Sequence, residues 1–232
     1  MLAKKYKSEL ISIINPLEGI YTLEFASLSG KYKYHPGQFL HIAIDEDYDG
    51  ISQWPDSRCF SMQSSPDEET IKIAYAVKGQ FTKQMEQQLK VGSEVWLKLP
   101  YGDLFTQPHN KENTVFIAGG TGITPFLSLF THESFSEYNN PRIYLGFRSK
   151  EYNIYENELN FVKLRESFVK LYDPKIYYQD VDGIIDINSI FNENGHASDY
   201  FISGPPVMIK VFKDYLVKNK VLDDQIKTDE WE

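Results

Sequence analysis

The sequence predicts a β domain followed by an α/β domain: an antiparallel Greek-key β-barrel over residues 1–104, then a doubly wound parallel α/β domain over residues 113–232. Three observations lead to this fold class. The first hundred residues contain short runs rich in β-branched and aromatic residues, bounded by Gly, Pro, Asp or Ser, as in an antiparallel barrel or sandwich. From residue 113 onward such runs alternate with helical stretches, which is typical of a parallel sheet covered by helices. Residues 105–112, with Pro108 and several polar side chains, are the expected linker.

The individual elements follow from local patterns. In the first domain one helix is predicted where Phe81, Met85 and Leu89 recur at four-residue intervals, with Thr82 near its start as a candidate cap. The strands predicted for this domain are Tyr6–Ile14, Ile20–Phe25, Gln38–Ile44, Arg58–Met62, Thr70–Val77 and Glu94–Leu99. The second domain is predicted to contain strands Thr114–Ala118, Arg142–Phe147, Lys175–Gln179 and Tyr200–Ser203, and helices Pro125–Thr131, Glu156–Arg165, Asp186–Phe191 and Pro206–Lys218.

Composition excludes several classes of function. The net charge of −9 disfavours nucleic-acid binding, because an acidic chain repels phosphate backbones. The single cysteine, Cys59, rules out an intrachain disulfide and a four-cysteine metal or iron–sulfur site, and the five scattered histidines lack metal-site spacing. No run approaches the roughly 20 apolar residues of a membrane helix, and no signal-peptide pattern is present. We therefore expect a cytoplasmic enzyme without membrane insertion and without a metal site.

A glycine-rich turn follows a predicted strand and opens a predicted helix. Its glycines let the backbone pass close to a diphosphate, and N–H groups at the helix start would face the anion. Pro125 suits the first helical turn, where its missing N–H costs nothing. Taken alone, the turn is better explained as a plain strand-to-helix connection, so the other motifs decide. The residues assigned to it are Gly119, Gly120, Thr121, Gly122, Thr124 and Pro125.

Three further motifs accompany this turn, and the four together carry a family resemblance. Arg58-Cys59-Phe60-Ser61 lies on a predicted barrel strand, Gly79-Gln80-Phe81-Thr82 at the predicted helix start, and Ser203-Gly204-Pro205-Pro206 after a strand of the second domain. Their order and spacing resemble the ferredoxin–NADP reductase superfamily over nearly the whole chain. Pro36-Gly37-Gln38-Phe39 and Leu99-Pro100-Tyr101-Gly102 look like the barrel motifs of the same family.

The resemblance implies a flavin site in the first domain. Arg58 would pair with the flavin phosphate, because a guanidinium fork suits two oxygens. Phe60 stands where the family usually has a tyrosine, so the contact with the flavin ring survives while the hydroxyl hydrogen bond is lost. Ser61 would hydrogen-bond N5, the atom that receives the hydride. The backbone of Gly79–Thr82 would hold a diphosphate, which favours FAD over FMN. The other residues placed along the flavin are Cys59, Gln80, Phe81, Ala76 and Val77. For Phe60 and Phe81, packing in the core remains the alternative role.

The C-terminus adds a second resemblance. Asp229-Glu230-Trp231-Glu232 is similar to the Asp-x-Trp ending of the diflavin reductases. In those enzymes the tryptophan covers the flavin and the acid lies near the reacting atoms. The resemblance implies that Trp231 of this chain covers the flavin and moves aside, and that Asp229 helps to orient the nicotinamide. A solvated tail is the alternative. Ser203 replaces the family's cysteine and still offers a hydrogen bond near the nicotinamide, with Gly204 and Pro205 beside it.

The identity of the electron donor stays open between NADH and NADPH. NADP members of the family often carry Ser-Arg at about Leu171-Tyr172, and its absence here favours NAD. Arg148 and Lys150 are nearby basic residues that would suit a 2′-phosphate.

The resemblance therefore implies hydride transfer from NADH or NADPH to FAD, followed by electron transfer to a separate acceptor, because no flavodoxin-like, haem or cysteine-bearing ferredoxin segment is present. The acceptor, a small redox protein, an oxygenase or a small molecule, and the oligomeric state are not predicted. One alternative is a free-flavin reductase, because the sequence of Phe60–Pro66 is similar to the corresponding segment of those enzymes. Another is a non-catalytic subunit that senses dinucleotides.

Overall fold

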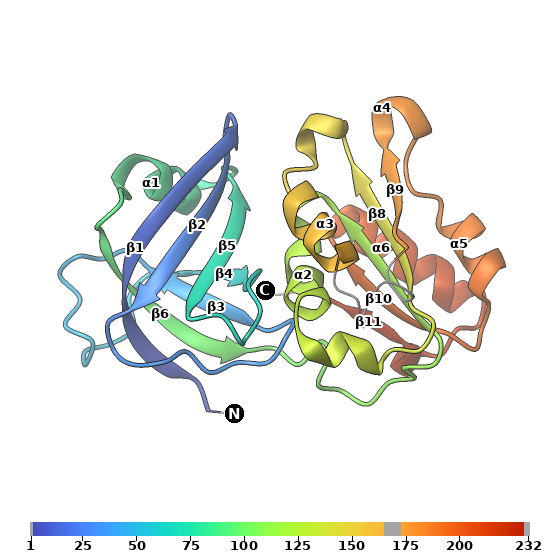
Figure 1. The fold of residues 1–232 in the computed structure, drawn as a ribbon, viewed down its shortest axis with the longest axis horizontal. Helices are drawn as coiled ribbons and strands as arrows, with labels where there is room; N and C mark the ends of the chain where they lie inside the picture. Colours follow the sequence, from blue (N-terminus) through green and yellow to red (C-terminus); the bar gives the residue numbers. More distant parts are fainter. Residues whose placement is uncertain (1, 165–172, 230–232) are drawn as a thin grey trace. The chain divides into compact units, whose positions relative to one another are not determined.

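The computed structural model describes residues 2–164 and 173–229 and divides into two compact units, Met1–Asp103 and Leu104–Glu232 (Figure 1). Within these described ranges, no helix combines the length and apolar character needed to cross a membrane.

The first unit is an antiparallel sheet that closes almost completely into a barrel. Its strand order is β4-β3-β6-β1-β2-β5, and every neighbouring pair is antiparallel. The edge strands approach each other beyond β4, where the N–H of Gln63 donates to the carbonyl of Lys72 at 2.8 Å. The Lys72 N–H donates in turn to the Ser64 hydroxyl at 3.0 Å. The predicted barrel is thus confirmed, with strands β1 (Lys4–Leu17), β2 (Ile20–Ser27), β3 (Phe39–Ala43), β4 (Arg58–Ser61), β5 (Thr70–Ala76) and β6 (Glu94–Tyr101).

Alternation along these strands fills the barrel with apolar side chains. Leu10, Leu40 and Leu97 are fully buried while their strand neighbours reach outward, as the two-residue period of a strand requires. Helix α1 (Gln80–Gln88) adds Phe81 and Met85 to the same core, four residues apart as predicted. The core of the barrel thereby fixes where α1 begins.

The second unit is a parallel sheet of order β11-β10-β7-β8-β9. The chain builds outward through β7, β8 and β9, then returns to the other side of β7 for β10 and β11. The order therefore reverses between β7 and β10, and the predicted parallel sheet is confirmed. The strands are β7 (Thr114–Gly119), β8 (Arg142–Phe147), β9 (Lys175–Tyr178), β10 (Asp199–Ser203) and β11 (Ile226–Thr228), of which β11 had not been predicted.

Helices pack against both faces of this sheet. Val115 and Ile117 of β7 share a buried cluster with side chains of α5 and α6. Phe116, which points to the opposite face, packs its ring on Phe126 and Phe130 of α2. A central strand covered on both faces is apolar throughout, as β7 is. The helices are α2 (Thr124–Phe130), α3 (Glu156–Leu164), α4 (Gln179–Asp182), α5 (Ile187–Asn194) and α6 (Pro206–Lys218), with short 3₁₀ turns η1 (Gly120–Ile123), η2 (Glu133–Glu137), η3 (Lys150–Tyr152) and η4 (Asp223–Gln225).

The expected linker, residues 105–112, packs on the second unit. The Phe105 ring lies 5.2 Å from that of Phe201, and the N–H of Asn110 donates to a carboxylate oxygen of Asp199 at 2.6 Å. Asp199 is buried and lies 3.7 Å from the equally buried Lys227 ammonium. A buried carboxylate needs such partners, so the 105–112 segment is part of the packing of this unit.

The burial of His109 should make the stability of the second unit depend on pH. Its Nδ1 donates to the carbonyl of Gln107 and its Nε2 accepts from the Tyr138 hydroxyl, both at 2.7 Å. Burial, which disfavours the charged form, lowers the His109 pKa below its ordinary 6.5. The unfolded chain therefore takes up the proton at a higher pH than the folded one, and the free energy of unfolding should fall as pH drops below 6.5.

Urea unfolding followed between pH 5 and pH 8 would measure this dependence. We expect His109→Gln to flatten the decline below pH 6.5 relative to the unchanged chain. An equally steep decline in both proteins would assign the pH dependence to other groups.

Candidate functional site

The two motifs predicted to bind phosphate in the first unit lie together. Arg58 begins β4, and its guanidinium carbon lies 5.3 Å from the centre of the Phe81 ring at the start of α1. Its Nη1 donates to the Asp56 carboxylate at 2.9 Å and to the Ser57 carbonyl at 2.7 Å. Both contacts use the same nitrogen, so the described residues leave the Nε and Nη2 side of the fork available. The side chain is 54% exposed, which places that side within reach of a ligand.

The start of α1 is organised by one hydroxyl. Thr82 Oγ1 accepts the N–H groups of Lys78 and Gly79 at 3.0 and 3.1 Å and donates to the Gly79 carbonyl at 3.0 Å. No described side chain caps the N–H groups of Gln80, Phe81 and Thr82 that follow. A Cβ added at Gly79 would meet no atom within 4 Å, so space is open at this point. Uncapped N–H groups beside open space suit an anion.

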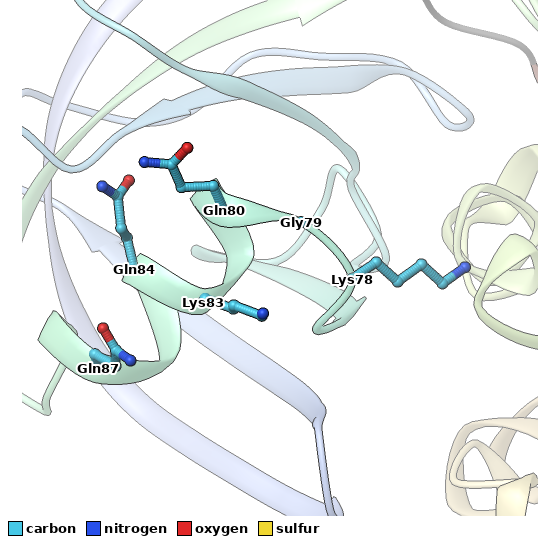
Figure 2. A pocket seen from close by; sticks show the side chains of 6 residues that line it. All are labelled: Lys78, Gly79, Gln80, Lys83, Gln84 and Gln87. Atoms are coloured by element: carbon cyan, nitrogen blue, oxygen red, sulfur yellow. The ribbon is translucent and has the colours of Figure 1, made fainter.

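An open pocket of about 470 Å³ extends along α1 from this start (Figure 2). Lys78 and Lys83 are the charged residues of its lining, and the remaining side chains are amides. The sequence reasoning had not selected either lysine, although both flank the Gly79–Thr82 motif. The pocket is lined by Lys78, Gly79, Gln80, Lys83, Gln84 and Gln87.

Ser61 and Cys59 share one face of the barrel sheet with three aromatic rings. In the β3–β4 pairing Ser61 lies opposite Phe39, and Cys59 opposite His41. Tyr101 stacks on Phe39 at 5.6 Å and meets the His41 ring edge-on at 4.7 Å. The Cys59 sulfur lies 3.4 Å from His41 Nε2, and burial raises the pKa of this thiol and lowers that of the imidazole. His41 and Tyr101 were not among the predicted site residues. Their position beside Cys59 and Ser61 follows only from the pairing of β3 with β4 and β6.

Phe60 points to the other face of β4, opposite Leu40. It is half-buried, and its ring lies 5.8 Å from that of Tyr75 on β5. Ala76 ends β5, and the N–H of Val77 donates to the Gly19 carbonyl at 2.8 Å. Phe60 thus contacts the core and keeps part of its ring exposed, whereas Phe81 is buried in the core.

In the second unit the glycine turn meets the Ser203-Gly204 segment at the point where the strand order reverses. A Cβ added at Gly122 would lie 2.4 Å from the Gly204 nitrogen and 2.6 Å from the Ser203 carbonyl carbon. Gly204 itself has φ +149°, and a Cβ there would fall 3.0 Å from the Gly119 nitrogen. The segments after β7 and β10 therefore pass in backbone contact, which only glycine permits. Open α/β sheets bind ligands in the crevice at this reversal.

The remaining predicted residues of the turn and of the Gly-Pro motif lie at the same edge. Thr124 donates its hydroxyl to the Thr121 carbonyl at 3.0 Å and begins α2, with Pro125 in the first turn. Gly120 has φ +55° and no atom within 4 Å of an added Cβ. Pro205 precedes α6, and its Cδ would lie 3.1 Å from a Cβ on Gly119.

Two predicted catalytic residues are brought into direct contact. The Ser203 hydroxyl donates to Oδ2 of Asp229 at 3.0 Å, and the Asp229 N–H donates to the Ile202 carbonyl at 3.0 Å. Strand β11, parallel to β10, is what carries Asp229 to this position. Trp231, the third residue predicted here, lies outside the described residues.

The predicted donor-selecting residues lie at the ends of β8 and β9. Arg148 follows β8, is exposed, and lies over the Tyr152 ring at 5.6 Å. Lys150 is exposed at the start of η3. The Leu171-Tyr172 position lies outside the described residues.

No protein-family model matches the chain, but curated proteins do. The reductase component of propane 2-monooxygenase from Mycolicibacterium goodii is 24% identical over 237 aligned positions, covering 95% of this chain and 66% of the relative. The corresponding component from Rhodococcus jostii (strain RHA1) is 28% identical over 221 positions, covering 86% and 56%. The chain thus spans between about half and two thirds of these relatives.

A solved structure shares the fold over its full length. A ferredoxin NADP+ reductase from Neisseria gonorrhoeae, with bound FAD and NADP, superposes with a TM-score of 0.79 at 16% identity. The superposition covers 97% of this chain and 98% of that one. Both units therefore occur together, in this order, in a protein of similar size.

Proposed function

Because the chain belongs to the ferredoxin–NADP reductase superfamily, we propose that it is a flavoprotein that takes a hydride from NADH or NADPH onto FAD and passes electrons to a separate acceptor. The observation that carries the proposal is the contact of Arg58 with Phe81, which gathers a guanidinium fork and the uncapped start of α1 at one point.

The residues of the first unit fit FAD. Arg58 and the N–H groups from Gln80 to Thr82 would hold its diphosphate. When bound, FAD supplies N5 as the hydride-accepting atom and releases electrons singly or in pairs. Ser61 would donate its hydroxyl to N5, with Cys59 on the same strand face. Phe60 of the same strand, and Ala76 and Val77 at the end of β5, would also contact the flavin.

The second unit would bind and orient the dinucleotide. The backbone from Gly119 to Pro125 would lie against the diphosphate. The Ser203 hydroxyl donates to the Asp229 carboxylate and holds it at the edge of the sheet, where it would help to orient the nicotinamide. Trp231 would cover the flavin until the nicotinamide arrives.

The acceptor is proposed to be a separate redox protein or oxygenase component, in keeping with relatives that are reductase components of propane 2-monooxygenase. We place the protein in the cytoplasm, where NADH and NADPH are available. The domain boundaries proposed from sequence, 1–104 for the flavin domain and 113–232 for the dinucleotide domain, fit this division of roles.

The visible spectrum of the purified protein, followed by anaerobic addition of NADH or NADPH, tests the proposal. A flavin spectrum that bleaches with either donor is expected. A colourless protein that oxidises the donor only when flavin is added would replace the proposal with a free-flavin reductase. A yellow protein that neither donor bleaches would favour a non-catalytic dinucleotide sensor.

Ser61→Ala should slow flavin reduction about tenfold without lowering flavin content, because one hydrogen bond to the reacting atom is lost while phosphate contacts remain. Anaerobic stopped-flow absorbance would measure the rate. Ser61→Thr retains a hydroxyl and should recover most of it. An unchanged rate in Ser61→Ala would remove this residue from the mechanism.

A further inference from the structure

The thioether of Met208 packs against the two backbone segments that meet where the strand order reverses. A Cβ added at Gly119 would lie 2.9 Å from the Met208 sulfur, and one added at Gly204 would lie 2.7 Å from its terminal methyl carbon. The two glycines therefore leave the space that this thioether fills. Met208 lies in the first turn of α6, so it holds the segment after β7 and the segment after β10 at a fixed spacing.

Met208 is also the methionine most open to reagents among those that the structure describes. Met62 and Met85 are 0% and 1% exposed in the core of the barrel, whereas Met208 is only partly buried. It packs at the margin of the apolar cluster that β7, β10 and α6 share. Because oxidation of sulfur-bearing side chains follows their exposure, a dissolved oxidant should reach Met208 before the other two.

Oxidation of the Met208 thioether by hydrogen peroxide is a balanced two-electron step. The peroxide transfers one oxygen atom to the sulfur, which becomes a sulfoxide, and the rest of the peroxide leaves as water. A reduced flavin that passes two electrons to dioxygen, with two protons, supplies the peroxide. The new oxygen makes the side chain larger and polar. Since the sulfur and the methyl carbon already contact both glycine segments, the larger group must push these segments apart.

From this packing we propose that Met208 is an oxidation site, and that its conversion to the sulfoxide by hydrogen peroxide weakens dinucleotide binding at the glycine turn. The proposal rests on the proposed function, which places the dinucleotide at this turn and provides the reduced flavin. Methionine sulfoxide is reduced back to the thioether by sulfoxide reductases, so the loss of binding is reversible. Peroxide formed by the reduced flavin then limits further reduction of that flavin.

Calorimetric titration of the holoprotein with NAD⁺ and, separately, with NADP⁺, before and after hydrogen peroxide, tests the proposal. Peptide mass spectrometry should show the added oxygen at Met208 before it appears at Met62 or Met85. The affinity for the dinucleotide should then fall about tenfold or more, because the glycine turn is displaced. Flavin content should stay the same, and a methionine sulfoxide reductase with dithiothreitol should restore the affinity.

Met208→Leu is the matched control, because leucine is apolar, has a similar volume and carries no sulfur. Cys59, Met62 and Met85 are unchanged in this variant, so oxidation of any of them would act in both proteins. The affinity of Met208→Leu should be the same before and after peroxide. Oxidation of Met208 without loss of affinity, an equal loss in Met208→Leu, or oxidation of the buried methionines first would overturn the proposal.

Urea unfolding separates a failure of this proposal from a failure of the proposed function. If the untreated holoprotein bound neither dinucleotide, the assignment of the glycine turn, and with it the proposed function, would be wrong. The oxidised protein should still unfold at a lower urea concentration than the untreated protein, with no such shift in Met208→Leu. Equal unfolding midpoints before and after oxidation of Met208 would show that the sulfoxide fits between the two segments, and would overturn the inference by itself.

Discussion

Arg58→Ala is expected to yield a protein that loses its flavin during purification. The substitution removes a guanidinium that lies beside the start of α1, together with its contact to Phe81. Hydrogen bonds to a charged group contribute about 2–3 kcal/mol, which corresponds to roughly 30- to 150-fold weaker binding. The ratio of flavin to protein absorbance after gel filtration, and the dissociation constant for added FAD, measure the effect.

Two control variants separate the roles of Arg58. Arg58→Lys keeps the charge but loses the fork, and should fall between the alanine variant and the unchanged chain. Asp56→Asn breaks the exposed ion pair while keeping the guanidinium, and an exposed pair contributes at most about 1 kcal/mol. Asp56→Asn should therefore retain its flavin. Full flavin occupancy in Arg58→Ala would remove Arg58 from the phosphate site.

Gly122→Ala should abolish most dinucleotide-dependent reduction while leaving flavin content intact. The new Cβ would lie 2.4 Å from the Gly204 nitrogen, so the backbone of one loop must move. Overpacking against backbone costs about 3 kcal/mol, and a displacement of about 1 Å at the crevice lowers the reduction rate by roughly 100-fold. Stopped-flow reduction and urea unfolding together report both effects.

Gly120→Ala is the matched control within the same turn. Gly120 has φ +55° but no atom within 4 Å of an added Cβ, so alanine meets only the backbone strain of about 1–2 kcal/mol. We expect a smaller loss of stability than in Gly122→Ala and a detectable reduction rate. Equal behaviour of the two variants would show that conformation, and not the contact with Gly204, governs this turn.

Elements with strong local patterns could be predicted from the sequence. Helix α6 begins and ends where predicted, and β8 does as well, because apolar periodicity and flanking Pro or Gly define both. Strand β11 escaped prediction because Ile226–Thr228 is too short to show alternation. Its strand conformation comes from pairing with β10, which is distant in the chain.

Some residues of the candidate site belong to motifs that are visible in the sequence, but their contacts could not be predicted from it. The motif Arg58–Ser61 was visible in the sequence, whereas the stacking of Arg58 on Phe81 depends on how the barrel places α1. The Ser203–Asp229 hydrogen bond likewise depends on β11. His41 gave no sequence signal, because its position beside Cys59 follows only from the β3–β4 register.

The attachment of residues 105–112 to the second unit determines where the gene can be divided for domain exchange. Phe105 rests on Phe201, and Asn110 supplies an N–H to the buried carboxylate of Asp199. If the junction were placed after residue 112, the second unit would lose both contacts. A chimera that joins the second unit to a different barrel should therefore be spliced between Asp103 and Leu104, so that the second unit is transferred with these contacts intact.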